Sequence, residues 1–546
     1  MLRIINGEVY DPINGINGQV QDIWVRGDKI VTGLQNTDQP QMVIDAAGMV
    51  VMPGGIDIHS HIAGPKVNVG RTLRPEDHRR EVVARTGVTR SGVGETVPST
   101  FITGYKYARM GYTTVMEAAA PPLKVRHVHE EFSDLPMIDK GLFTLMGNNH
   151  FIMEFIKKGE REKLTNYVAW LLASTKAFAI KVVNPGGVES WKQGQEISGL
   201  DELVRGYGVT PRQIITNLVE VNEEIGLPHP VHLHCNNIGQ AGNYQTTLET
   251  LRSVEGQRIH LTHLQFHSYG GQSKKELCSK AEEIAAYIND HPKVTVDVGQ
   301  VIFGPATTMT ADSPLQWHLH KLTGNKWCNS DVELETGSGV VPLTFREQSL
   351  ANSIQWAVGM ELFLLIENPW QVFLTTDHPN AGPFTAYPKV IRLLMDRDYR
   401  EEVFASLHPS AAARTWVKEL RKEYTLQDIV IITRAGPAKA LGLTNKGHLG
   451  IGADADLAIY PKKENKEEMF SSPAYVIKDG ELVVNQGEIV TQTFGKTLFV
   501  EPYFEPWIEK EISCEFAALY SVSLANYPVE LEYLQQYEVI PCRSTV

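Results

Sequence analysis

Two histidines separated by one residue follow an apolar segment near the start of the chain. His59 and His61 come after the run from Val50 to Met52 and a Pro-Gly-Gly turn, in the stretch MPGGIDIHSHIAG. Alternate residues of a β-strand point to the same face, so both imidazoles can reach one metal ion. The strand and the turn before it make this pair more specific than a bare His-x-His. We therefore predict a metal-binding pair at the carboxyl end of a strand.

A lysine lies inside a second apolar segment. Lys181 is part of AIKVVNPGG, where a buried ammonium group is costly without compensation. Its ammonium either reaches the solvent, or the amine has lost its proton and captured carbon dioxide as a carbamate. A carbamate supplies two oxygens and one negative charge, which suits the bridging of two cations. Other segments end in further candidate ligands, namely His232, His234, His260, His263, His267 and Asp377.

The segments that carry these residues alternate with helical patterns, which is typical of a parallel α/β fold. After the first strand, seven more are predicted at 112–122, 142–149, 178–187, 229–237, 259–271, 294–300 and 372–380. Eight such strands close into a (β/α)8 barrel, whose active site lies at the carboxyl ends of the strands. The candidate ligands stand at those ends.

Both ends of the chain have the pattern of short strands and turns. We expect residues 1–52 and 435–500 to form one composite β-sandwich domain, and residues 53–434 to form the barrel. The remaining segment, 501–546, is rich in aromatic residues, so we expect an ordered extension that packs on the barrel or on a partner subunit.

Composition excludes several classes of function. The formal net charge of −13 argues against a nucleic-acid partner. The five cysteines form no CxxC pair, which argues against an iron–sulfur cluster and suits a reducing cytoplasm. Neither a signal segment nor an apolar stretch long enough to span a bilayer is present in the sequence, so we expect a cytoplasmic protein without a membrane partner.

The His-x-His segment resembles the first barrel strand of the amidohydrolase superfamily of metal-dependent hydrolases. By position, the resemblance implies a carbamylated Lys181 and favours His234 over His232 and His263 over His260. It also places Asp377 as the residue that moves a proton from the attacking water to the leaving nitrogen. The implied ligands of two divalent ions are His59, His61, Lys181, His234, His263 and Asp377. Ligands of this kind suit zinc, with manganese, iron or nickel as alternatives.

Longer segments of the sequence narrow the resemblance to one family within this superfamily. They are HSHIAGPKVNVGR, IKVVNPGGVESW, HLHCNNIGQAGN, THLQFHSYGG and TTDHPNAGPF. They resemble the A-subunit family of formylmethanofuran dehydrogenases and of the bacterial formyltransferase/hydrolase complex, and the likeness covers nearly the whole chain. This resemblance implies a component of one-carbon metabolism that interconverts an N-formyl furfurylamine cofactor and water with formate and the free amine. The cofactor would be formyl-methanofuran or formyl-methylofuran.

The same resemblance implies partners and substrate-binding residues. The partners are the B, C and formyltransferase-like subunits of the complex, and redox chemistry belongs to subunits other than this chain. Basic residues after the first strand are candidates to hold an acidic cofactor tail, and three later residues are candidates to orient the formamide. The first group is Lys66, Arg71, Arg74, Arg79 and Arg80, and the second is Asn236, Asn237 and His267.

Two alternatives stay open at this point. The chain could be another amide or cyclic-amide hydrolase of the superfamily, such as a hydantoinase or dihydropyrimidinase. It could also be a non-catalytic scaffold subunit that kept the barrel, although a complete ligand set argues against that.

Overall fold

A parallel barrel forms the centre of the computed structural model, which describes residues 1–33, 40–330 and 338–543. Its eight strands follow one another in chain order around a ten-stranded sheet. They are β6 (Gly55–Ser60), β7 (Tyr112–Ala120), β8 (Asp139–Leu145), β9 (Ala179–Val183), β10 (His232–His234), β11 (Ile259–Leu261), β14 (Val294–Asp297) and β18 (Val372–Phe373). A parallel bridge between Ser60 and His378 connects the first strand to the segment after the last. The predicted fold class is confirmed.

Several strands are shorter than predicted, because the backbone turns where the candidate ligands stand. The sixth strand stops at Leu261, because His263 has a left-handed φ of 34° and a 3-10 helix, Leu264–His267, follows. The eighth stops at Phe373, and Asp377 has a φ of 48°. Positive φ is uncommon for residues other than glycine and is enriched at functional sites. These turns direct both side chains into the mouth of the barrel.

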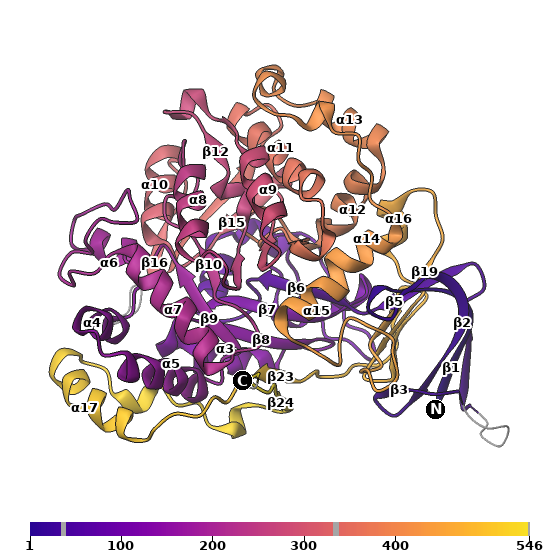
Figure 1. Ribbon diagram of the computed structural model, residues 1–546. Coiled ribbons are helices and arrows are strands. Elements are labelled where there is room, and N and C mark those ends of the chain that lie inside the picture. The colour runs from indigo at the N-terminus through magenta and orange to yellow at the C-terminus, as the bar shows by residue number, and fades with distance from the viewer. Residues whose placement is uncertain (34–39, 331–337, 544–546) are drawn as a thin grey trace.

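Helices cover the outside of the barrel (Figure 1). Between the strands lie α2 (Thr100–Arg109), α3 (Val125–Ser133), α4 (His150–Lys158), α5 (Arg161–Thr175), α7 (Pro211–Ile225), α8 (Tyr244–Ser253), α9 (Ala281–Asp290) and α11 (Leu350–Leu365). The sequence sets their limits, as α7 illustrates. Thr210 and Gln213 form a capping box, Pro211 occupies the first turn, and Gly226 ends the helix with a φ of 73°.

Strands from both ends of the chain join in one nine-stranded sheet beside the barrel (Figure 1). The N-terminal strands are β1 (Leu2–Asp11), β2 (Ile16–Arg26), β3 (Lys29–Val31), β4 (Met42–Asp45) and β5 (Met49–Pro53). The later ones are β19 (Leu457–Pro461), β20 (Tyr475–Lys478), β21 (Glu481–Asn485) and β22 (Glu488–Ile489). The two groups meet where β5 pairs antiparallel with β19. The predicted domain boundaries stay a prediction.

Two further segments lie against the barrel. After β14 comes a three-stranded antiparallel sheet of β15 (Gly304–Thr308), β16 (Cys328–Ser330) and β17 (Ser338–Phe345), with α10 (Ser313–Thr323) between its strands. Near the C-terminus, β23 (Thr497–Phe499) pairs with β8 and with β24 (Tyr537–Val539), and α17 (Trp507–Leu519) packs on α5. Within the described ranges, no helix combines the length and apolar character needed to cross a membrane.

Candidate metal centre

The two histidines of the first strand meet the carboxylate that follows the last strand. His59 Nε2 lies 3.0 Å from Asp377 Oδ1, and His61 Nε2 lies 3.3 Å from the same oxygen. All three side chains are buried. The structure therefore brings together two imidazoles and one carboxylate at the point where the barrel closes.

Asp377 is held rigidly by its own turn. Its amide donates to Thr375 Oγ1 at 2.9 Å, and Asn380 Nδ2 donates to Asp377 Oδ1 at 2.8 Å. Burial alone would favour the neutral acid, but His59 and His263 hold the pKa of Asp377 well below its usual range. Asp377 is therefore an ionised carboxylate, which can bind a cation or accept a proton.

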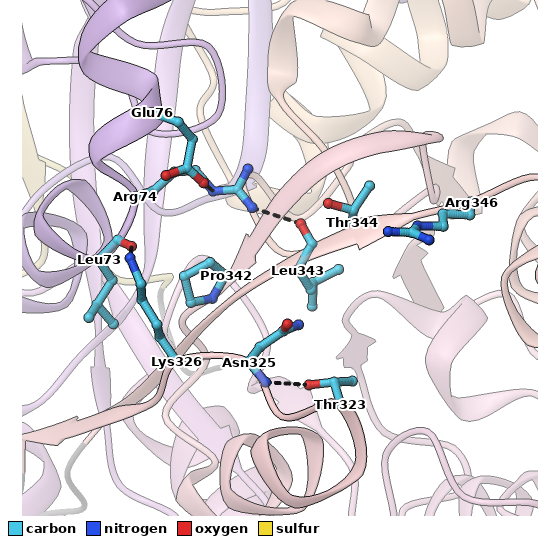
Figure 2. A pocket seen from close by; sticks show the side chains of 10 residues that line it. All are labelled: Leu73, Arg74, Glu76, Thr323, Asn325, Lys326, Pro342, Leu343, Thr344 and Arg346. Atoms are coloured by element: carbon cyan, nitrogen blue, oxygen red, sulfur yellow. Dashed lines mark hydrogen bonds and ion pairs between the residues drawn. The ribbon is translucent and has the colours of Figure 1, made fainter.

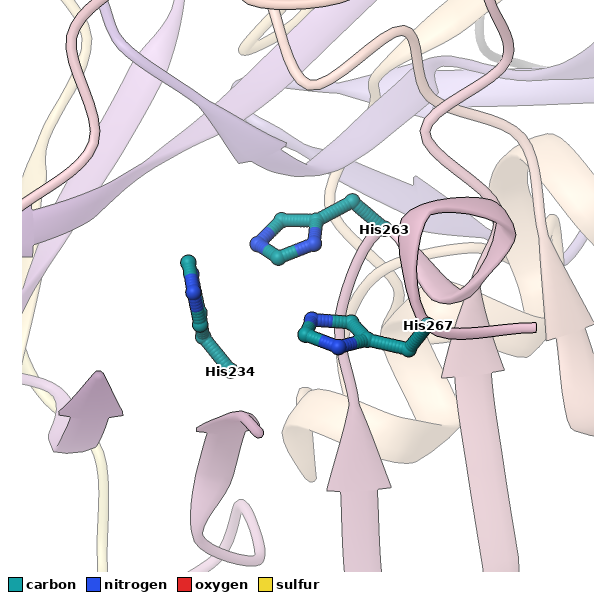
Figure 3. A group of neighbouring side chains, drawn as sticks. All are labelled: His234, His263 and His267. Carbon is teal, nitrogen blue, oxygen red and sulfur yellow. The ribbon is translucent and has the colours of Figure 1, made fainter. Parts of the chain in front are cut away.

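A second group of imidazoles gathers next to the first (Figure 3). His234, His263 and His267 bring ring nitrogens within 4.8 Å of one another, and all three residues are buried. Among the described residues, Nδ1 of each ring has no hydrogen-bond partner. Buried polar atoms are normally satisfied, so neighbouring imidazoles with partnerless nitrogens fit a ligand that accepts lone pairs. A divalent cation is such a ligand.

The structure distinguishes His234 and His263 from their neighbours His232 and His260. His232 is contacted at both ring nitrogens, by His59 at 2.9 Å and by His229 at 3.0 Å. Both nitrogens of His260 are also occupied, by Thr295 Oγ1 at 2.9 Å and Asp297 Oδ2 at 3.1 Å. Of these four histidines, His234 and His263 alone have ring nitrogens without a partner in the described ranges, which supports their selection from the motifs.

Lys181 is enclosed in the barrel wall. Its strand β9 pairs with β10, where Lys181 lies opposite His232. Its side chain is 1% exposed, and Nζ lies 3.4 Å from Thr262 Oγ1. Burial lowers the pKa of Lys181 to about 7, although Asp297 and Asp377 act in the opposite direction. A substantial fraction of this lysine is therefore a free amine at neutral pH.

Three carboxylates near the site were missed from the sequence. Glu117 on β7 accepts from His61 Nδ1 at 3.0 Å, and Asp297 on β14 accepts from the His263 amide at 2.7 Å. Asp312, which caps α10, lies 3.3 Å from His234 Nε2. The first two are charges within apolar strands, the signal that singled out Lys181. Asp312 lies in a connection, where no periodic pattern could reveal it.

The predicted substrate-binding residues are placed in several environments, and their roles stay predictions. Lys66 is buried and pairs with Glu117 at 2.8 Å, while Arg71 pairs with Glu131 at 2.6 Å. Asn236 is buried and donates to Asn184 Oδ1 at 2.8 Å, but its own Oδ1 has no partner among the described residues. Asn237 instead donates to the Ser198 carbonyl at 2.7 Å. His267 stands in the second imidazole group described above.

A surface pocket of about 440 Å³ lies apart from the candidate ligands, beside the inserted sheet (Figure 2). Arg74, Lys326 and Arg346 line it together with Glu76. Arg74 directly follows α1 (Pro65–Leu73), and its guanidinium donates to the carbonyls of Ala306 and Leu343 at 2.9 and 2.8 Å. Arg74 therefore anchors the insertion. Arg80 pairs with Glu95 at 2.6 Å, and Arg79 is exposed.

Comparison with known proteins decides the family. The model of the amidohydrolase family matches residues 42–490, which include all six candidate ligands. The chain belongs to the amidohydrolase family. It is therefore a member of a family of hydrolases, as the first resemblance indicated.

Relatives match this amidohydrolase over its whole length. Protein FwdA of Methanocaldococcus jannaschii is 50% identical, with 99% of each chain aligned. The A-subunit of the formyltransferase/hydrolase complex Fhc of Methylorubrum extorquens is 37% identical, with 100% of each chain aligned. The crystal structure of that FhcABCD complex with methylofuran superimposes with a TM-score of 0.93, at 37% identity and full coverage of both chains. The resemblance to this A-subunit family is confirmed.

Proposed function

We propose that the chain is the two-metal hydrolase subunit that interconverts an N-formyl furfurylamine cofactor and water with formate and the free amine. The observation that carries the proposal is full-length likeness at 50% and 37% identity to FwdA and to its counterpart in the Fhc complex. The solved relative is a complex with methylofuran. Formyl-methanofuran or formyl-methylofuran is therefore the substrate class, and the working form is a complex with partner subunits.

The residues that would hold two divalent cations are the six predicted ligands. His59, His61 and Asp377 converge on one side, and His234 and His263 carry nitrogens without a hydrogen-bond partner in the described part of the chain on the other. Cys235 is adjacent in sequence, but burial raises the pKa of its thiol to about 12, so thiolate is not available. Imidazole and carboxylate ligands without thiolate support zinc, with manganese, iron and nickel as alternatives.

Lys181 would complete the set as a carbamate. Only a neutral amine attacks carbon dioxide, and burial of this lysine favours that form. The product carries a negative charge, which compensates two cations in a place where an ammonium would repel them. A carbamate would thus replace an unfavourable buried amine with an anionic ligand.

Amide hydrolysis needs a polarised carbonyl, a nucleophile and a proton carrier. Two bound cations supply Lewis acidity and make water nucleophilic near neutral pH. Asp377 is ionised and fixed by Asn380, so it can accept the proton of the attacking water and deliver it to the departing nitrogen. Glu117 accepts from His61 Nδ1, which leaves Nε2 of that ring facing Asp377. Asn236 and His267, whose buried atoms lack partners among the described residues, would orient a formamide.

A substrate panel tests the proposal. The zinc-loaded chain, alone and with its partner subunits, is assayed with formylated furfurylamine cofactor, hydantoin and dihydrouracil, and formate and ring-opened products are quantified. Formate from the first substrate alone supports the proposal, whereas turnover of the cyclic amides alone would identify a hydantoinase-type enzyme. Metal analysis tests the alternative that the chain is a non-catalytic scaffold, because such a subunit should bind well under two equivalents of metal.

A further inference from the structure

A row of buried histidines runs through the barrel from its far end to the candidate metal centre. The His229 Nδ1 atom lies 2.8 Å from the Ala440 carbonyl oxygen. His229 Nε2 lies 3.0 Å from His232 Nδ1, and His232 Nε2 lies 2.9 Å from His59 Nδ1. Each of these three histidines has at most 1% of its surface exposed. The row begins at helix α15 (Gly436–Leu441), outside the candidate metal site.

Each hydrogen bond in the row has one proton between its two heavy atoms. In the first of these bonds, only one of the two atoms can be the donor. A carbonyl oxygen only accepts, so His229 Nδ1 carries a hydrogen and donates to Ala440. In a neutral ring the other nitrogen is then an acceptor, so His232 Nδ1 donates to His229 Nε2. By the same step His59 Nδ1 donates to His232 Nε2. The direction set at Ala440 is therefore transmitted through two rings.

We propose that the Ala440 carbonyl, acting through His229 and His232, holds His59 in the tautomer protonated at Nδ1, so that the Nε2 lone pair faces the metal centre. His229 and His232 are positioning residues here, because they act through His59. The inference rests on the proposed metal role of His59. It adds that the tautomer of His59 is determined by a hydrogen bond at the opposite end of the barrel.

The reverse direction would need a cation in an apolar place. Nδ1 of His229 is committed to Ala440, so His229 could donate to His232 only if its ring were doubly protonated. The ring instead stacks on Phe143, with centroids 5.4 Å apart, and the positive charges of Arg258 and Lys181 oppose a second proton on it. Burial accordingly keeps the pKa of His229 well below its ordinary value.

Asp297 supports the same direction independently. Its Oδ2 lies 3.3 Å from His59 Nδ1, and a carboxylate oxygen can only accept there. The same oxygen accepts from His260 Nε2 at 3.1 Å, which leaves His260 Nδ1 to accept from Thr295 Oγ1. Every contact around His59 Nδ1 is therefore satisfied by a hydrogen on that atom.

The first test uses the wild-type chain and needs neither substrate nor turnover. In ¹⁵N-histidine-labelled protein, imidazole nitrogen shifts and one-bond couplings identify the protonated nitrogen of each ring. The proposal expects hydrogen on Nδ1 and none on Nε2 in His229 and His232, with and without zinc, and the same pattern in His59 when zinc is bound. Without zinc, His59 Nε2 lies 3.0 Å from the ionised Asp377 and carries a second hydrogen, while Nδ1 keeps its own. Hydrogen on Nε2 of His229 or His232 would overturn it. Failure of formamide turnover with this pattern intact would count against the proposed function alone.

The second test compares three variants by zinc affinity in a chelator competition. His229→Phe keeps a ring but removes the acceptor for His232, and should weaken zinc binding on the order of 10–100-fold, the effect of losing an outer-shell partner. His229→Gln carries both an acceptor and a donor, and should recover most of that loss. His129→Phe is the matched control, because His129 is equally buried and bonds a backbone carbonyl at 2.9 Å outside the row. Equal zinc affinity of the folded His229→Phe and His129→Phe variants would contradict the proposal.

Discussion

Asp377 is the carboxylate shared by both histidines of the first strand, and its replacement tests proton transfer at the level of one residue. Asp377→Asn is nearly isosteric but cannot accept a proton, so turnover should fall on the order of 10²–10⁴-fold. Melting temperature and metal content, measured on the same sample, should show a folded chain with at least one metal. A folded variant with near-wild-type formate release would remove Asp377 from the proton-transfer role.

Replacement of Lys181 tests whether this residue carries the proposed carbamate. Lys181→Ala should lose metal and activity together, and short carboxylic acids should restore part of both by occupying the same place. Because the pKa of Lys181 is lowered to about 7, reloading of the apo chain with zinc and bicarbonate should become less efficient as the pH falls below 7. Metal analysis after reloading at a series of pH values measures this. Two metals bound beside a free ammonium in a high-resolution map would contradict the carbamate.

At the level of elements, a buried charge network fastens the nine-stranded sheet to the barrel. Lys446 Nζ lies 2.5 Å from Asp139 on β8 and 3.0 Å from Asp456, and Lys478 Nζ lies 3.0 Å from Asp139. Asp139→Asn leaves two buried ammonium groups undercompensated, and should lower the free energy of unfolding by about 3 kcal/mol in a denaturant titration. The control is Asp22→Asn, whose partner Arg3 is 39% exposed, and which should change stability little. Equal effects of the two substitutions would contradict the role of the network.

The network also predicts a pH dependence. Burial opposes ionisation of Asp139, but Lys446 and Lys478 hold its native pKa below the ordinary carboxyl value of 3.8. A lowered native pKa means that this stabilisation is fully present above pH 3.8 and is lost as the pH falls further. Between neutral pH and about pH 3, the wild-type chain should therefore lose more stability than Asp139→Asn. Unfolding titrations at each pH check the difference.

The elements also explain what could be predicted from the sequence. Hydrophobic runs give the barrel strands and their order, and His59-x-His61 is readable because a strand alternates its faces. The ends of strands are not readable in this way, because the turns at His263 and Asp377 depend on positive φ values that tertiary contacts impose. Nor does periodicity show that His232 is occupied on both sides while His234 is not.

At the level of the whole molecule, the proposed function assigns hydrolysis to this chain and electron transfer to other subunits. The candidate ligands would hold two cations and include a proton carrier, and zinc, the proposed metal, has no redox chemistry at such a site. The five cysteines of the sequence form no CxxC pair, which argues against a cluster in this chain. The chain should therefore act on a formamide without any electron acceptor.

The most direct measurement of this claim is formate release from formylated furfurylamine cofactor by the purified zinc-loaded chain, with and without an artificial electron acceptor. We expect equal amounts of formate and free amine, at a rate that the acceptor does not change and that a chelator abolishes. Reduction of the acceptor by this chain alone, or the absence of formate from a folded chain with two metals bound, would contradict the claim.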